Sequence, residues 1–238
     1  MIEKALKFLT EKLAAANIHD INGETYSDKP LHRINHNPLA EAIEMHTLSS
    51  LVDYMKSRLD SRDDVFVHVI SPTKVKVYSA LDIEREREYL VEVNAQLPSF
   101  RFNEFMNHEE FCINLQSKFV DSPDRALLLK FAGTVEAGSV AQYGDDGVSQ
   151  KATIKTGVAS KSDALVPNPV SLSAYRTFLE VEQPCAQYIF RMKQNSAGGV
   201  LCGLFEADGG AWKIEAMDAI KNFLDEELEG VGSLVVIS

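Results

Sequence analysis

Glycine is distributed very unevenly along this chain of 238 residues, and that distribution limits where the backbone can turn tightly. Twelve of the thirteen glycines follow Phe131, and only Gly23 precedes it. Glycine reaches positive φ without steric cost, so glycines between apolar runs mark turns that link strands, or a strand and a helix. The sequence therefore predicts a C-terminal half built from hairpins, with turns at Gly144/Gly147, Gly198/Gly199 and Gly209/Gly210.

The first part of the chain combines helical and strand periodicities. Residues 2–16 carry an apolar stripe at helical spacing, which predicts an amphipathic helix. Residues 17–38 are rich in Asn, Asp, His and Pro and predict an extended arm with little regular structure. A second helix is predicted over 48–59. Alternating apolar residues then predict a three-strand meander over 65–93, with a hairpin turn at 71–74.

Two helices and a long hairpin are predicted in the middle of the chain. Asn107, followed three residues later by a glutamate, predicts the N-cap of one helix, and Ser122-Pro123 predicts the start of the next. The hairpin spans 134–158. The later predicted elements are a polar loop over 160–169, strands over 175–181, 187–192 and 200–205, a helix from Trp212 to Gly230 and a short strand over 234–237.

Together these elements predict an α+β fold. Its expected parts are antiparallel β-sheets with packed helices, an N-terminal arm that is partly helical and partly extended, and a long central β-hairpin. We expect residues 1–47 to form the N-terminal helix and arm, and residues 48–238 to form the α+β domain.

The acidic balance of the chain argues against a nucleic-acid partner. The formal net charge is -11, from 24 Lys and Arg against 35 Asp and Glu. Such a charge repels a polyanion unless a local basic patch opposes it. The densest basic stretch, Arg85 to Arg87, is interleaved with glutamates. No nucleic-acid partner is predicted.

The cysteines and the N-terminus predict a cytoplasmic protein. Cys112, Cys185 and Cys202 are isolated and odd in number, which favours buried thiols over disulfides or zinc ligands. Charged residues interrupt the apolar residues of the N-terminus, so no signal peptide is expected. No run approaches the length of a membrane span, so no membrane partner is expected.

Histidines and carboxylates gather in one short segment, and both side-chain types bind divalent metals. Their spacing does not fit a helical metal motif, because Asn and Pro interrupt the segment and no glutamate follows the first histidine. We interpret them as polar arm residues and predict no metal or other cofactor, with metal binding left as the alternative for titration. The residues are His32, His36, Glu41, Glu44 and His46.

Three further patterns have a catalytic and a structural interpretation. Cys112 and His108 stand four residues apart, as a nucleophile and base on one helix face would, but Cys112 adjoins the apolar stripe and favours packing. His68 lies inside a predicted strand and is interpreted as structural. Paired carboxylates serve general acid-base chemistry, but the context of the scattered carboxylates in this chain favours turns and solvated faces. These residues are Glu84, Glu86, Glu88, Asp145, Asp146, Asp163 and Glu182.

The densest aromatic stretch lies before the central helices. It comprises Phe100, Phe102, Phe105 and Phe111. A stacking platform for bases would also need basic residues, and only Arg101 is present. These aromatics therefore predict core or interface packing.

The order of motifs resembles the phage and prophage family typified by YfdQ. The likeness spans about 48–230 and rests on a helix at Glu109-Glu110-Phe111, an apolar helix after Pro123-Asp124, Val166-Pro167 and a strand at Tyr188-Ile189-Phe190-Arg191. The chain departs from the family pattern where tryptophans are expected, and carries Phe100, Phe102 and Phe105 instead. The resemblance implies a phage-encoded, cytoplasmic accessory protein and supplies no site residue.

The leading functional hypothesis is a non-enzymatic protein that assembles with itself, as a ring or a closed, capsid-like shell. It rests on the polar arm, the apolar final strand, the glycine-flanked hairpin and the lack of catalytic motifs. One alternative is a binding module that masks a host protein or sequesters a small ligand. The other is a metal-dependent hydrolase that uses clustered carboxylates.

Overall fold

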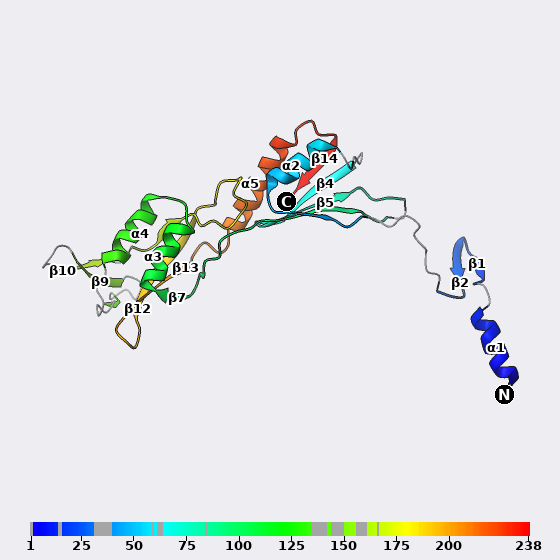
Figure 1. Ribbon diagram of the computed structural model, residues 1–238, viewed down its shortest axis with the longest axis horizontal. Coiled ribbons are helices and arrows are strands. Elements are labelled where there is room, and N and C mark those ends of the chain that lie inside the picture. The colour runs from blue at the N-terminus through cyan, green and yellow to red at the C-terminus, as the bar shows by residue number, and fades with distance from the viewer. Residues whose placement is uncertain are drawn as a thin grey trace. The chain divides into compact units, whose positions relative to one another are not determined.

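The computed structural model describes residues 2–238 apart from 14–15, 31–39, 59, 61–63, 84, 135–141, 144–149, 156–160 and 166. It divides the chain into two compact units, Met1–Ala40 and Glu41–Ser238 (Figure 1). Helices and β-sheets are both present, and most neighbouring strands run antiparallel, so the predicted α+β class is confirmed.

The first unit contains a helix and a β-hairpin. Helix α1 (Ile2–Leu13) is followed by strands β1 (Ile18–Ile21) and β2 (Glu24–Ser27), which pair antiparallel. Asn22 and Gly23 both have positive φ, 57° and 84°, as a two-residue hairpin turn requires. The prediction of an arm with little regular structure is therefore wrong for 18–27, because the Asn-Gly turn outweighs the polar composition of the segment.

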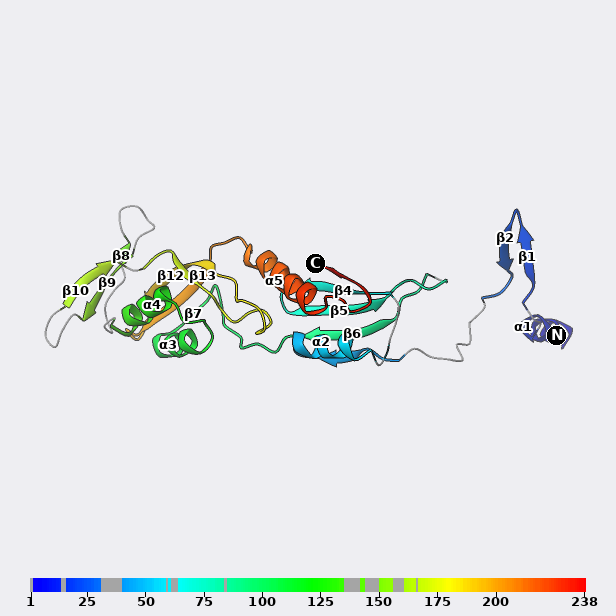
Figure 2. The same ribbon diagram turned by 90° about the horizontal axis from the view of Figure 1, so that it is seen from above.

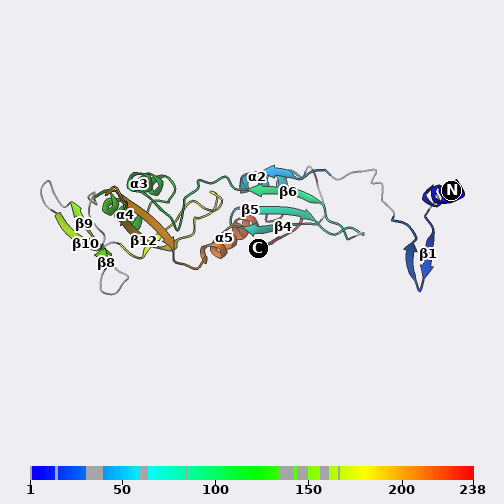
Figure 3. The same ribbon diagram turned by 90° about the horizontal axis from the view of Figure 1, so that it is seen from below.

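A five-stranded sheet forms one half of the second unit (Figure 3). Its strand order is β14 (Ser233–Ile237), β4 (Asp64–Ser71), β5 (Lys74–Ser79), β6 (Tyr89–Asn94) and β3 (Ile43–Met45). The predicted meander β4-β5-β6 and the C-terminal strand are confirmed. Both outer pairs are parallel, so the prediction of purely antiparallel sheets is wrong here. Side-chain alternation is the same in both kinds of strand and does not reveal strand direction.

Helices α2 (Leu48–Ser57) and α5 (Trp212–Glu227) lie on one face of this sheet (Figure 1). They bury Leu48, Leu51, Ile220 and Leu224 against a layer of valines from the three central strands. The valines, all fully buried, are Val67, Val69, Val75, Val77, Val91 and Val93. The opposite face carries alternate residues of the same strands, among them Phe66, His68, Lys74, Lys76, Tyr78 and Glu92.

The second core lies under a four-stranded antiparallel sheet (Figure 2). Its order is β11 (Val170–Leu172), β12 (Ala186–Gln194), β13 (Val200–Glu206) and β7 (Phe105–Asn107). Helices α3 (His108–Ser117) and α4 (Pro123–Thr134) pack on it through buried residues including Phe111, Leu115, Leu128 and Phe131.

Both predicted helix caps are confirmed. Asn107 Oδ1 accepts a hydrogen bond from the Glu110 backbone N–H at 2.8 Å, and Ser122 Oγ accepts one from the Arg125 N–H at 3.1 Å. Each cap satisfies a backbone donor that the first turn of a helix leaves without a partner.

Two predictions between the helices and β12 are wrong. The predicted polar loop over 160–169 contains strand β10 (Lys161–Leu165), which forms a three-stranded sheet with β9 (Gln150–Lys155) and β8 (Gln142–Tyr143). The predicted strand over 175–181 is an irregular segment instead, because its backbone groups bond to side chains. Of the predicted hairpin over 134–158, β8 and β9 pair antiparallel, and the turn at Gly144/Gly147 lies outside the described residues.

Candidate functional site

The predicted histidine and carboxylate cluster lies only partly within the described residues. His32 and His36 lie outside them, so metal binding by the arm stays a hypothesis. Glu41 and Glu44 are exposed, and His46 Nδ1 lies 3.1 Å from the Asn94 carbonyl oxygen. Over the described part of the chain, no three His, Cys, Asp or Glu side chains gather in an arrangement that holds a metal ion.

The Cys112–His108 pair does not have the geometry of a nucleophile and its base. His108 Nε2 lies 2.6 Å from the Ala132 carbonyl oxygen and 3.7 Å from Cys112 Sγ. A carbonyl oxygen only accepts, so Nε2 carries the proton and has no lone pair for the thiol. Burial also raises the pKa of the Cys112 thiol, which disfavours the reactive thiolate. The packing interpretation of this pair is supported.

The other predicted candidates form no metal-binding group among the described residues. Glu84, Asp145 and Asp146 are outside the described residues, Asp163 lies on β10, and Glu86 and Glu182 are exposed. Glu88 is half-buried, and its backbone N–H donates to Ser79 Oγ at 2.9 Å. His68 is half-buried on β4. Cys202 is buried as predicted, but Cys185 is exposed, so the prediction of buried thiols is wrong for that residue.

The four predicted aromatics all make packing contacts. Phe111 is fully buried and stacks on Phe190, with ring centroids 5.4 Å apart. Phe100 and Phe102 are half-buried and meet the Phe119 ring edge-on, and Phe105 packs against Phe205 on the other side of the sheet. The packing interpretation is confirmed by these contacts.

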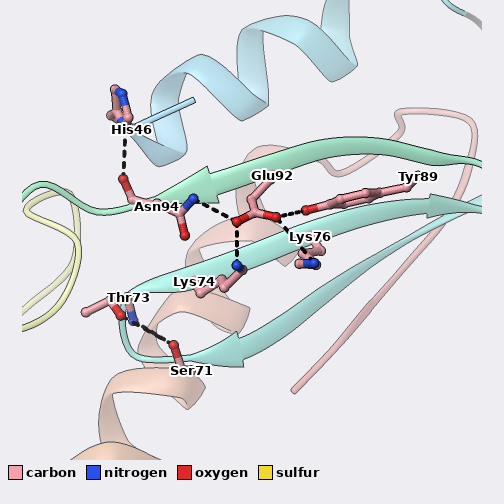
Figure 4. Close-up of polar contacts among 8 residues, drawn as sticks. All are labelled: His46, Ser71, Thr73, Lys74, Lys76, Tyr89, Glu92 and Asn94. Carbon is pink, nitrogen blue, oxygen red and sulfur yellow. Dashed lines mark hydrogen bonds and ion pairs between the residues drawn. The ribbon is translucent and has the colours of Figure 1, made fainter. Parts of the chain in front are cut away.

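A dense polar network surrounds Glu92, on the face of the five-stranded sheet opposite the helices (Figure 4). Its carboxylate accepts hydrogen bonds from Lys74, from the Tyr89 hydroxyl and from Asn94 Nδ2, the last at 2.9 Å, and pairs with Lys76 Nζ at 3.3 Å. The bond from Lys74, followed by those from Tyr89 and Asn94, holds the pKa of Glu92 far below its usual range. A carboxylate held ionised in this way is a poor proton donor or base, so the network is structural.

A row of aromatic rings crosses the same face. Phe66, Tyr78 and Tyr89 stack across three strands, with centroids 5.2 and 5.3 Å apart. Arg87 lies 4.6 Å from the Phe66 centroid, and Lys76 lies 4.3 Å from that of Tyr89. Each ring contacts another ring, and a cation covers each outer ring. This arrangement stabilises the sheet and leaves the rings poorly placed to stack on bases.

The irregular segment 173–185 is held by the buried side chain of Gln183. Its Oε1 accepts from the backbone N–H groups of Arg176 and Thr177 at 3.0 and 3.2 Å, and its Nε2 donates to the Phe178 carbonyl at 3.0 Å. The Thr177 hydroxyl donates to the Pro72 carbonyl in the β4–β5 turn at 2.6 Å. One side chain therefore fixes the backbone that carries Arg176.

Arg176 is the most unusual residue of this segment, because its guanidinium group is buried. Its side chain is 9% exposed, and Nη1 binds Glu206 Oε1 at 2.9 Å. The cation lies over the Trp212 ring, with Cζ 3.7 Å from the centroid, and 5.5–5.6 Å from the rings of Phe102 and Tyr188. Buried cations are rare unless paired, and here the paired carboxylate is itself one-third exposed.

Arg176 also lines a cavity of about 280 Å³. Lys118 is the second cation of the lining, and its Nζ donates to the Ser99 carbonyl. The rest of the wall is mainly apolar: Leu97, Pro98, Phe100, Phe102, Ala174 and Tyr175, with Thr73. This cavity with its two cations is the candidate functional site of the chain.

The sequence gives no local signal for this site. Its residues come from five separate stretches between Thr73 and Trp212, and three of these stretches contribute a single residue each. Comparison with protein-family models, with curated proteins and with solved structures gives no match. None of the helices described has the length and the apolar character needed to cross a membrane.

Proposed function

We propose that this chain is a phage-encoded, cytoplasmic and non-enzymatic protein that assembles with copies of itself into a ring or a closed shell. The N-terminal unit supplies the contact. The phage origin follows from the resemblance to the YfdQ family, and self-assembly follows from the surface of this unit.

The observation that carries the proposal is the exposure of the apolar stripe on α1. Ile2, Leu6 and Leu9 share one face of the helix and are 77%, 59% and 56% exposed. The hairpin adds Ile18, Ile21 and Tyr26, each more than half exposed, and no side chain described in Met1–Ala40 is buried. A unit of this size without a core needs a second surface to cover its apolar residues.

The energetics favour covering this stripe. Full burial of an exposed Ile or Leu contributes about 1.5–3 kcal/mol, so the three partly exposed side chains of α1 contribute roughly 3–6 kcal/mol per helix. A symmetric contact uses two such helices. The gross gain from two helices is therefore roughly 6–12 kcal/mol, and the loss of translational and rotational freedom on association offsets part of it.

Charge favours a second copy as the partner. Residues 1–40 contain five Lys and Arg and five Asp and Glu, so the net charge of -11 lies entirely in residues 41–238. The acidic bodies of two copies repel each other, whereas the neutral N-terminal unit approaches either body without that repulsion. The net negative charge of the chain therefore does not oppose assembly through an apolar contact of the neutral N-terminal unit.

Size-exclusion chromatography with light scattering tests the proposal. We expect the full chain at micromolar concentration to run at a multiple of its 26.4 kDa mass. The double variant Leu6→Gln/Leu9→Gln is expected to run as a monomer. The matched control Glu3→Gln/Lys7→Gln places the same residue type on α1 away from the apolar stripe, keeps the net charge, and is expected to assemble like the unchanged chain.

A monodisperse 26.4 kDa species of the unchanged chain would contradict the proposal. So would assembly that is equal in both double variants. Negative-stain images of the assembled fraction separate a ring from a closed shell.

A further inference from the structure

The guanidinium group of Arg176 has one edge that the described residues leave unused. Its Nη1 is taken by Glu206, but Nε and Nη2 are buried and meet no acceptor in the part of the chain that the structure describes. The Nε–H and Nη2–H bonds lie on the same edge of the planar group and point in parallel. That edge fits the two oxygens of a carboxylate in a bidentate pair.

Two more buried donors surround the same cation. The Tyr188 hydroxyl and Trp212 Nε1 are buried and likewise find no hydrogen-bond partner among the described side chains and backbone groups. Both rings lie within 5.6 Å of Arg176 Cζ. Buried polar atoms in native proteins are nearly always hydrogen-bonded, so these unused donors point to an acceptor other than the described residues.

The cavity next to Arg176 has the charge and the surface for such an acceptor. Its lining includes the two cations Arg176 and Lys118 and no Asp or Glu, which selects for an anion. Phe100, Phe102 and their neighbours give the remaining wall an apolar character. Its volume of about 280 Å³ lies just below the usual range for ligand pockets, about 300–1000 Å³, and suits a small ligand.

We propose that this cavity binds a small organic carboxylate with an apolar body. Arg176 Nε and Nη2 are covered in the unliganded chain, so the guanidinium group turns toward the cavity when the ligand binds. The carboxylate then pairs with the Nε/Nη2 edge, Lys118 adds a second positive charge, and the body of the ligand lies against Phe100 and Phe102. Inorganic phosphate has no apolar part for this wall, and water alone supplies no charge, so both are weaker occupants. The site lies within Glu41–Ser238 and is separate from the assembly contact proposed on α1.

Titration calorimetry with cyclohexanecarboxylate tests this site in the full chain. We expect saturable binding of one molecule per chain. The neutral isostere cyclohexylmethanol, which lacks the carboxylate, and inorganic phosphate, which lacks the apolar body, are each expected to bind at least about tenfold more weakly. Trp212 is the chain's one tryptophan and packs on Arg176, so its fluorescence is expected to change along the same binding curve.

Two variants separate the bidentate pair from general positive charge. Arg176→Lys keeps a cation but removes the two-donor edge, and it is expected to weaken cyclohexanecarboxylate binding at least about tenfold. Lys118→Gln is expected to weaken it several-fold without disturbing the Arg176–Glu206 pair. The control Arg101→Gln removes a guanidinium that is 57% exposed and paired with Glu110, and is expected to bind like the unchanged chain.

Circular dichroism establishes that each variant is folded before it is titrated. If Arg176→Lys does not fold, Lys118→Gln alone carries the test, because Lys118 is half-buried at the cavity wall. Three results would each overturn the proposal: equal affinity for the carboxylate and the alcohol, tighter binding of phosphate than of the carboxylate, or unchanged affinity in Lys118→Gln. Absence of any binding by the unchanged chain would do the same.

Discussion

Replacing Gln183 with alanine tests whether one buried amide holds the segment that carries Arg176. Gln183 is 8% exposed, and its amide accepts two backbone hydrogen bonds and donates to backbone carbonyls of the same segment. The segment 173–185 contains no helix or strand, so these bonds replace the ladder that a regular element would provide.

The expected loss follows from the bonds that Gln183→Ala removes. The backbone N–H groups of Arg176 and Thr177 lose the acceptor at 3.0 and 3.2 Å, and these residues are only 9% and 0% exposed. A buried donor left without an acceptor costs about 1–3 kcal/mol. The Phe178 carbonyl also loses its donor, although a carbonyl tolerates this better than an N–H does. We expect a total loss of about 2–5 kcal/mol in the free energy of unfolding.

Urea unfolding followed by far-ultraviolet circular dichroism measures this loss. With an m-value of about 1–3 kcal/mol/M, the midpoint is expected to fall by roughly 1 M or more. All samples are compared at one chain concentration, because self-association shifts apparent stability. The matched control Gln187→Ala removes an exposed glutamine on β12 and is expected to change stability by less than about 0.5 kcal/mol. Equal effects of the two substitutions would refute the assignment of Gln183 as the organiser of this segment.

Three further predictions concern the sheets and the thiols. Folding lowers the pKa of Glu92, so this carboxylate stabilises the fold fully at pH values above its unfolded-state pKa of about 4.3, and the contribution is lost as the pH falls. Glu92→Gln should therefore lower the melting temperature at pH 7 and make little difference in strong acid. Gly203→Ala should cost about 1–3 kcal/mol in chemical unfolding, because a Cβ there would lie 2.7 Å from a backbone carbonyl oxygen. A disulfide reagent should modify exposed Cys185 rapidly, partly buried Cys112 more slowly, and buried Cys202 only on unfolding. Burial raises the pKa of the Cys112 thiol and raises that of Cys202 to about 12. Rapid modification of all three would contradict this.

The elements that the sequence predicts well are those whose signal is local. The caps at Asn107 and Ser122 need only the residues of one helical turn, and the β4–β5 hairpin needs only alternation around a Pro-containing turn. The Asn22-Gly23 dipeptide is also a strong local signal, because this pair favours a two-residue hairpin turn. The polar composition of 17–38 concealed it, because composition averages over a segment whereas a turn depends on two residues.

The parallel outer strands and the irregular segment could not be predicted in this way. A parallel pair such as β14–β4 joins residues some 170 positions apart, and nothing in either strand alone encodes the direction of the other. Residues 175–181 alternate as a strand would. Their irregular conformation depends instead on hydrogen bonds to Gln183 and to the Pro72 carbonyl. Both partners lie outside the residues whose alternation predicts a strand.

The candidate site lies in an irregular segment for a physical reason. Helices and strands satisfy their backbone groups among themselves, so their inward side chains are free to be apolar, as the valines of the five-stranded sheet are. An irregular segment that is buried must satisfy its backbone with side chains, and Gln183 does so here. The segment therefore contains polar side chains that are buried and held in place by hydrogen bonds. A cation such as Arg176 can be buried beside such side chains. A ligand that occupies the unused edge of Arg176 would complete a hydrogen-bonded network that the described residues leave open.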